Sequence, residues 1–303
     1  MEINKFRSIS AFHHYAHLPP PEHPLVSLID YSKINYPIQE GVIRWIQGFY
    51  TIGVKRNIGG KFSYGQQPYD FDEGIMSFVS PKQLIRLDIM PDKQAEPTGW
   101  LLLLHPDFLW NTGLAKTIHQ YDFFDYAIHE ALFLSKKEED KIITLLKTIQ
   151  EEYQSVVDPF TQGIIIAQVE LLLNHAQRFY TRQFITRKVT NDKLLHQLEK
   201  LLQQCFESDN LIAKGLPTVR QIATQLHLSP NYLSNMLTTL TGQSTQQHIH
   251  DKLIEKAKEK LSTTALSINE IAYELGFEHP TSFSKLFKQK TSLSPNKFRL
   301  SFQ

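Results

Sequence analysis

The sequence predicts an α+β protein with more than one domain, on three observations. Residues 25–104 contain runs of branched and aromatic residues separated by Gly, Pro and Asp clusters, which is typical of short strands and turns. After Leu134 the apolar residues recur at helical spacing. The last part of the chain contains the same pattern of two short helices twice. The length of 303 residues agrees, since it fits two domains better than one.

These observations predict three parts. Residues 1–134 form a β-rich domain, residues 135–207 a helical region, and residues 208–303 an all-α domain. Short strands at such spacing suggest a barrel or a sandwich. The less regular stretch 208–216 is the expected boundary before the last domain.

The expected strands follow one another between residues 25 and 104. Each is rich in branched or aromatic residues, and Gly, Pro and Asp clusters separate them. The second segment is expected to form one long strand. The strand segments are LVSLID, IRWIQGFYTIGVKR, GIMSFVS, QLIRLDI and GWLLLLH.

Three helices are expected after the strands. Ser135 and Glu138 have the spacing of a capping box, so the first helix begins there. Asp158 and Pro159 mark the start of the second, because Pro is tolerated in a first helical turn. The third begins near Asp192, and its broad apolar face includes Cys205. These helices either cover the first domain or pair with a second copy, and the dimer face could belong to the first or the second of them.

Composition excludes several classes of protein. The longest purely apolar run, Trp100–Leu104, is far shorter than the roughly 20 residues of a membrane span. The first residues lack the pattern of a secretory signal. The single Cys205 excludes an internal disulfide and a cysteine-based metal cluster, and it fits a reducing compartment. We therefore expect a cytoplasmic protein.

The net charge of +1 is unevenly distributed along the chain. From Ala213 onward 11 Lys and Arg stand against 6 Asp and Glu, a balance of +5, whereas the rest of the chain has a balance of −4. A basic C-terminal part favours a polyanionic partner, because phosphates attract Lys and Arg whatever the sequence. A solvated surface with uneven charge is the alternative.

The C-terminal part repeats one pattern. TVRQIATQLHLSPNYLSNML (218–237) aligns with SINEIAYELGFEHPTSFSKLF (267–287) when the second copy is allowed one extra residue in its turn. Ala223 and Ala272 stand where two closely crossing helices need a small side chain. Gly276 provides a turn conformation that is costly for other residues, and His227 at that place in the first copy is expected to be strained. Each copy is therefore a helix, a tight turn and a second helix.

The second helix of each copy is expected to have an apolar back and a polar front near its start. Ser229 can cap the first, with Pro230 as its initial residue, and Pro280 begins the other. A helix that enters the DNA major groove touches base edges with its N-terminal residues. Lys288 and Lys290 lie further along, better placed for backbone phosphates. The outward residues are Asn231, Ser234 and Asn235 in the first copy, and His279, Thr281, Ser282 and Lys285 in the second.

Residues 246–261, QQHIHDKLIEKAKEKL, are expected to form one continuous helix between the copies. Its apolar face consists of Ile249, Leu253, Ala257 and Leu261. Such a helix would hold the two helix pairs at a fixed separation. If their second helices lie about 34 Å apart, one chain can enter successive major grooves on one face of the duplex.

With these motifs in place, the stretch from about Ala213 to Phe302 resembles the double helix-turn-helix domain of the AraC/XylS transcription regulators. The motifs are IATQLHLSPNYLSNML, LIEKAKEKL and SINEIAYELGFEHPTSFSKLFKQKTSLSPNKFR. The resemblance implies a sequence-specific transcription regulator that binds double-stranded DNA. The family's base-reading positions correspond to Asn231, Ser234 and Asn235 in the first unit and to Pro280, Thr281 and Lys285 in the second.

Two features depart from the family pattern. Residues 238–240, Thr-Thr-Leu, occupy the place of a basic segment, so we expect weaker phosphate contacts by the first unit. Lys252 stands where the family has an arginine, which keeps the charge and loses the bidentate geometry. The small polar residues of the first unit exclude guanine recognition by Arg, although Asn can pair with adenine.

The N-terminal part resembles the family less closely, through its order of strands and helices and the phrases EHPLVSLID and HPDFL. The resemblance implies a cupin-like β-barrel that senses an unidentified small-molecule effector, and helices that form a homodimer. It also implies RNA polymerase as a partner. Neither a membrane nor a cofactor is expected. Whether the protein is an activator or a repressor stays open.

Some residues of the first domain allow more specific hypotheses. The aromatic residues of the strands could line an effector pocket, although aromatic residues in strands more often form the core. The His residues His13, His14, His17 and His105 suggest a metal, but the strand region lacks the tight His-X-His pair of a metal-binding cupin, so none is expected. The aromatic residues are Trp45, Tyr50, Tyr64, Phe78 and Trp100.

Three other functions are alternatives to transcription regulation. A cupin enzyme with a DNA-binding tail needs a cluster of His and carboxylate ligands that the strands do not offer. DNA alkyl-transfer repair needs reactive and metal-binding cysteines, and Cys205 lies on the apolar face of a predicted helix. An interaction-only sensor that has lost DNA affinity is compatible with the few basic residues of the first unit.

Overall fold

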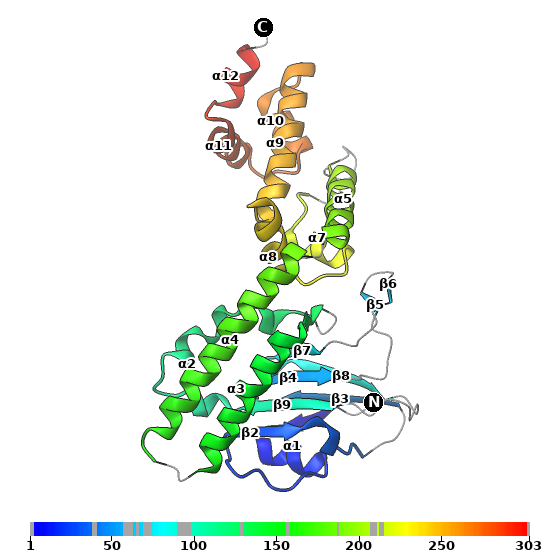
Figure 1. Ribbon diagram of the computed structural model, residues 1–303. Coiled ribbons are helices and arrows are strands. Elements are labelled where there is room, and N and C mark those ends of the chain that lie inside the picture. The colour runs from blue at the N-terminus through cyan, green and yellow to red at the C-terminus, as the bar shows by residue number, and fades with distance from the viewer. Residues whose placement is uncertain are drawn as a thin grey trace. The chain divides into compact units, whose positions relative to one another are not determined.

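The computed structural model contains two compact units, residues 1–183 and 184–303 (Figure 1). The boundary between them falls inside one helix, α4 (Thr161–Thr186). The three-part division expected from the sequence stays a prediction. The residues that the structure describes are 3–37, 41–56, 63–64, 67–68, 74–89, 98–127, 130–155, 158–186, 188–206, 211 and 215–301.

The strands of the first unit form two larger sheets and one short pair. The three-stranded sheet has the order β1 (Asn4–Phe6), β3 (Gly41–Gln47), β8 (Leu84–Ile89). The five-stranded sheet has the order β10 (Leu132–Phe133), β7 (Ile75–Val79), β4 (Tyr50–Arg56), β9 (Thr98–Leu104), β2 (Val26–Asp30). The pair consists of β5 (Ser63–Tyr64) and β6 (Gln67–Pro68). The β1–β3 pairing is parallel and the others are antiparallel.

The predicted closed barrel is wrong for the described strands, since no pairing joins the two larger sheets. The predicted long strand IRWIQGFYTIGVKR is divided between them, as β3 and β4. The division lies at Gly48, whose N–H donates to the Phe6 carbonyl at 2.7 Å. A Cβ at Gly48 would meet the Arg7 carbonyl oxygen at 3.1 Å. The chain therefore leaves one sheet and enters the other where the end of β1 approaches its backbone.

The two sheets pack face to face around one core. Ile43 and Trp45 of β3 meet Leu101 and Leu103 of β9 in a single buried cluster. A short helix that the sequence did not predict, α1 (Ile9–Tyr15), adds Ile9 and Phe12 to this cluster. The first unit is therefore a sandwich with a helix at one side.

The second face of the five-stranded sheet is covered by α3 (Lys136–Gln154). Leu102 and Leu104 alternate with Leu101 and Leu103 along β9, and all four are buried. Both faces of this strand are therefore dry, which explains its unbroken apolar sequence. Tyr153 accepts the Leu28 N–H at 2.9 Å and fixes the end of α3 to β2.

The helices of the first unit agree in part with the expected ones. Ser135 and Glu138 form the expected capping box at the start of α3. α4 begins at Thr161 and not at Pro159, because the Asp158 carboxylate accepts the N–H groups of Phe160 and Thr161. The short helices are η1 (Tyr31–Lys33), η2 (Pro106–Leu109), α2 (Leu114–Thr117), η3 (Ile118–Gln120) and η4 (Asp122–Asp125).

The second unit is helical throughout its described residues. After α5 (Lys188–Cys205), which begins before the predicted Asp192, two helix-turn-helix pairs flank a long helix. The first pair is α7 (Val219–Gln225) and α8 (Pro230–Thr241), and the second is α10 (Ile268–Glu274) and α11 (Pro280–Thr291). The long helix is α9 (Thr245–Thr263), and α12 (Pro295–Leu300) follows α11. The predicted apolar face of α9 is buried, as are Ala223 and Ala272.

The turns of the two pairs have the predicted backbone. Gly276 has a φ of 80° and His227, at the equivalent place, a φ of 57°. A Cβ at Gly276 would also approach the Leu216 nitrogen to 3.0 Å and the Gly215 Cα to 3.1 Å. Gly276 is therefore required both for its conformation and for close contact with residues 215–216.

None of the described helices is long and apolar enough to cross a membrane.

We expect Gly276→Ala to destabilise the second unit more than Gly242→Ala does. Both glycines have a positive φ, of 80° and 74°, but a Cβ at Gly242 would meet nothing within 4 Å. The left-handed conformation alone costs a non-glycine residue about 1–2 kcal/mol. Gly276→Ala adds a clash with the backbone, and we expect a total loss of about 3 kcal/mol. Urea unfolding of both variants measures the difference, and equal losses would show that the backbone contact has no energetic role.

Candidate nucleic-acid interface

The first recognition helix, α8, begins as the sequence predicts. The Ser229 side chain accepts the Tyr232 N–H at 3.2 Å, and Pro230 is the first helical residue. Pro suits this position because its missing N–H would have no partner inside the helix. Tyr232, Leu233, Met236 and Leu237 are buried and form the back of the helix. The opposite side near the start of α8 is left to polar residues.

The predicted base-reading residues of α8 are half-buried. Ser234 shares a hydrogen bond of 3.0 Å with the hydroxyl of Thr245, the first residue of α9. Asn231 and Asn235 also interact with other groups of the protein. These contacts restrain side chains whose freedom would otherwise be lost on binding. The front of α8 is therefore polar, small and ordered.

The second recognition helix, α11, presents a more open surface. Phe283 and Phe287 are buried behind it, and Pro280 at its start is half-buried. His279 precedes the helix in an extended conformation and makes no side-chain cap. The remaining predicted residues are exposed, namely His279, Thr281, Ser282, Lys285 and Lys288.

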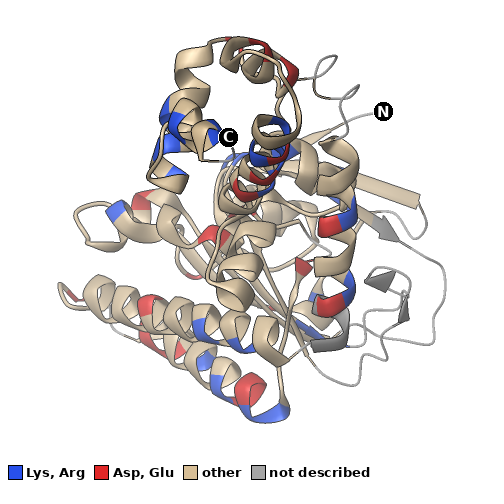
Figure 2. Cartoon of the chain, turned by 90° about the horizontal axis from the view of Figure 1, so that it is seen from above, with Lys and Arg blue, Asp and Glu red and all other residues tan. Residues whose placement is uncertain are grey.

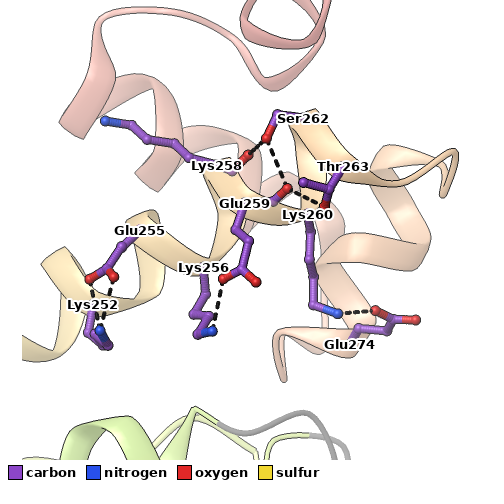
Figure 3. A network of polar contacts seen from close by, with 9 residues as sticks. All are labelled: Lys252, Glu255, Lys256, Lys258, Glu259, Lys260, Ser262, Thr263 and Glu274. Carbon is purple, nitrogen blue, oxygen red and sulfur yellow. Dashed lines mark hydrogen bonds and ion pairs between the residues drawn. The ribbon is translucent and has the colours of Figure 1, made fainter.

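Three lysines of the long helix α9 are paired within the protein (Figure 3). Lys252 pairs with Glu255 at 2.9 Å and Lys256 with Glu259 at 2.8 Å, each one turn apart. Lys260 pairs with Glu274 of α10 at 2.6 Å and so fixes the second helix pair to α9. Since Lys252 has a carboxylate partner of its own, its position contributes less net positive charge than an unpaired cation would.

Asp251 of α9 links the ends of the two recognition helices. Its carboxylate accepts a hydrogen bond of 2.9 Å from Gln243, just after α8, and pairs with Lys290 of α11 at 2.8 Å. Lys290, predicted to contact phosphate, is therefore already paired. Lys285 and Lys288 have no ion-pair partner among the described residues. They are the free cations of α11.

Two histidines lie beside this bridge. Burial lowers the pKa of His248, whose ring nitrogen lies 2.9 Å from the Thr241 hydroxyl. Burial, followed by the charge of Lys290, lowers the pKa of His250. Both imidazoles are therefore held toward the neutral form at physiological pH. The positive charge of this surface comes from lysines and not from these histidines.

Charge is distributed asymmetrically between the two helix pairs. α8 contains no charged residue, whereas α11 contains three lysines. Lys and Arg gather on the helices near the C terminus (Figure 2). Our sequence reasoning missed Arg220 in α7, which is exposed and has no ion-pair partner among the described residues. It could have been found, because it is the sole Lys or Arg between residues 218 and 241.

The first unit does not bring the predicted aromatic residues together. Trp45 lies between the sheets and donates its indole N–H to Gln47 at 3.1 Å. Phe78 and Tyr50 pack against Phe124 instead, at ring distances of 5.5 and 5.2 Å. Tyr64 has no described side chain, and Trp100 is half-buried with Lys147 near its ring. The aromatic residues whose side chains the structure describes therefore contribute to packing, which agrees with the alternative that aromatic residues in strands form the core.

His13 and His105 make structural contacts, whereas His14 and His17 are exposed. His13 is buried, with its ring nitrogens 2.6 Å from the Pro19 carbonyl and 3.0 Å from the Ser27 hydroxyl. Burial lowers its pKa. The His105 ring accepts the Asp107 N–H at 3.2 Å and caps the turn after β9. Among the residues that the structure describes, no three His, Cys, Asp or Glu side chains gather as metal ligands.

Two recognition helices that each begin with proline, packed on one connecting helix, define a helix-turn-helix transcription regulator. Residues 222–301 match the helix-turn-helix domain family. The chain is 35% identical over 245 residues to the Msm operon regulatory protein of Streptococcus mutans, an alignment that covers 80% of this chain and 81% of that protein. It is 35% identical over 94 residues to the arabinose operon regulatory protein of Escherichia coli, covering 31% and 32%. The chain therefore belongs to the AraC/XylS family of transcription regulators.

Other similarities are more local. The chain spans 43% of YfiF and 30% of YisR of Bacillus subtilis, and 51% of YijO of Escherichia coli, about half of these relatives or less. A solved structure, the C-terminal domain of AraT from Geobacillus stearothermophilus, is 32% identical. It covers 36% of this chain and 84% of that chain with a TM-score of 0.31.

Substitution of the two free lysines of α11 distinguishes base contact from phosphate contact. We expect Lys285→Ala to lower affinity for the cognate site by about 1–3 kcal/mol and to leave random DNA nearly unaffected. We expect Lys288→Ala to weaken both alike and to reduce the salt slope by about 1. Fluorescence anisotropy at several salt concentrations measures both.

Lys290→Ala serves as the matched control, because Lys290 lies on the same helix but is paired with Asp251. Equal losses on cognate and random DNA for Lys285→Ala would show a phosphate contact. An unchanged salt slope for Lys288→Ala would contradict its assignment.

Proposed function

We propose that this protein is a sequence-specific regulator of transcription that binds promoter DNA with both recognition helices. The observation that carries the proposal is the pair of proline-initiated helices α8 and α11, each 12 residues long, attached to a single helix α9. A helix of 19 residues rises about 28 Å, comparable to the 34 Å between successive major grooves. One chain can then contact two grooves on one face of the duplex.

The two units have different roles in this proposal. Asn231 and Asn235 contact base edges, and Asn is suited to adenine. Ser234, already bonded to Thr245, fixes the depth of α8 in the groove. In the second unit Thr281 and Lys285 contact bases, while His279, Pro280 and Ser282 surround the entry point. Arg220 and Lys288 bind phosphates, since both are exposed cations outside the first turns of α8 and α11.

The protein acts as a homodimer through α4 in this proposal. Ile164 and Leu171 are seven residues apart on one side of α4 and are 41% and 47% exposed, and Phe160 just before the helix is 72% exposed. Residues 136–154 of α3 expose no large apolar side chain. An exposed apolar stripe at this spacing is suited to pairing with an identical helix. This favours α4 over α3, between which the sequence did not decide.

The first unit would sense a small-molecule effector, as its family membership suggests, and RNA polymerase would be the partner in activation. An effector site within the sandwich would require the packed aromatic core to open, because Trp45 and Leu103 are buried there. Action on promoter DNA agrees with the cytoplasmic location that the sequence predicts.

Selection of bound sequences from a random DNA pool with the full-length protein tests the function. We expect a motif of two blocks about one helical turn apart, repeated if the dimer binds. The block contacted by α8 should tolerate salt better, because its helix pair contains a single cation, Arg220. Binding that is steeply salt-dependent and lacks any enriched motif, with and without candidate effectors, would favour the interaction-only alternative.

We expect Leu171→Asp to raise the dimer dissociation constant at least tenfold, because it places a charge in an apolar interface. Gln177→Asp is the matched control, since Gln177 is exposed on the same helix and lies about 120° around it from Leu171. Sedimentation velocity over a range of concentrations measures the change. If both variants stay dimeric like the parent, α4 is not the interface.

A further inference from the structure

A groove of about 300 Å³ lies between α3 and α4 of the first unit. Lys137 and Lys141 line it from α3, and Arg178 and Arg182 line it from α4. The spacing of four residues places each pair on one side of its helix, so the two basic stripes face each other across the groove. None of these residues takes part in the proposed DNA interface.

The groove has more positive charge than its own residues neutralise. Its single carboxylate, Glu138, receives two hydrogen bonds of 2.9 Å from Arg182 and also caps the start of α3. Lys137, Lys141 and Arg178 have no ion-pair partner in the part of the chain that the structure describes. Cations gathered in this way repel one another, so a bound anion would stabilise the arrangement.

A neighbouring imidazole is consistent with this field. The pKa of His175 is lowered by burial first, and then by the charges of Lys141 and Arg178. The His175 ring stacks on Phe179 at 5.7 Å, and both residues line the groove. The pair gives the groove a flat, largely apolar wall beside its cations.

Arg182 is held in place on two sides. Besides its bonds to Glu138, it donates to the Phe133 carbonyl at 2.7 Å. It therefore closes one end of the groove as a fixed wall. The charges that remain for a ligand are those of Lys137, Lys141 and Arg178, which are all exposed.

We propose that this groove binds a phosphorylated small molecule. Lys141 and Arg178 would contact the phosphoryl oxygens, because guanidinium and ammonium groups form charge-assisted hydrogen bonds with phosphate. The stacked His175 and Phe179 would contact the remainder of the molecule. The volume is at the lower end of ligand pockets, which suits a compound of the size of a sugar phosphate. The site is independent of the DNA-binding function, and its test measures no DNA binding.

Isothermal titration calorimetry with the full chain tests the proposal. The ligands are glucose 6-phosphate, glucose, inorganic phosphate and sulfate, all at the same ionic strength. We expect saturable binding of the phosphate ester and none of glucose. Tighter binding of the ester than of inorganic phosphate would identify a phosphorylated metabolite as the ligand class, and equal binding would identify phosphate itself. Absence of saturable binding by both would overturn the site.

Variants that each remove one positive charge, inside or outside the groove, show where the ligand binds. We expect Lys141→Gln and Arg178→Gln each to weaken binding at least tenfold. Lys136→Gln should change it less than twofold, because Lys136 lies on the same helix, pairs with Asp140 and does not line the groove. Circular dichroism verifies that each variant is folded. Equal effects of Lys136→Gln and Lys141→Gln would show that the anion is attracted by general surface charge, and would contradict a specific binding site.

Discussion

Burial of one apolar stripe along α9 is the constraint on which the whole C-terminal unit depends. Ile249, Leu253, Ala257 and Leu261 are each at most 2% exposed, and α8, α10, α11 and α12 all pack against this helix. A pair of short helices cannot bury a core of its own, so each helix-turn-helix pair needs this shared surface. The small Ala257 lets neighbouring helices approach. Because one helix supports both pairs, the recognition helices cannot move independently without exposing that stripe.

The C-terminal fold was predictable because its local signals agree with its packing. Ser229, Pro230 and Pro280 mark helix starts by capping chemistry, and Gly276 marks a turn by its backbone freedom. Such signals act between neighbours in sequence. The bond between Ser234 and Thr245, and the Asp251 bridge to Lys290, join residues 11 and 39 positions apart, and no local pattern specifies them. The helices of the candidate interface were therefore predictable, whereas the contacts that its side chains already make within the protein were not.

The first unit was harder to predict because its sheets depend on distant contacts. The strands themselves follow from composition, yet the change of sheet at Gly48 depends on the approach of the β1 end, at Phe6 and Arg7. α1 has a capping serine, Ser8, and buried Ile9 and Phe12 three residues apart, but a Pro-rich segment follows directly and obscures so short a helix. The sequence shows the basic residues of α3 and of α4 separately. That they face one another depends on the packing of the two helices, which no local pattern specifies.

The uneven charge of the two helix pairs implies an order of events on DNA. If Lys285 and Lys288 contact DNA as proposed, long-range attraction acts first on their helix pair, and we expect α11 to reach the duplex before α8 does. A protein bound to DNA only through the phosphate contacts of this helix pair can still slide along the duplex, because phosphate contacts are the same at every position. α8, without charge of its own, gains little until its small polar side chains meet matching bases. The first helix pair therefore adds to binding only after the protein has reached its cognate sequence.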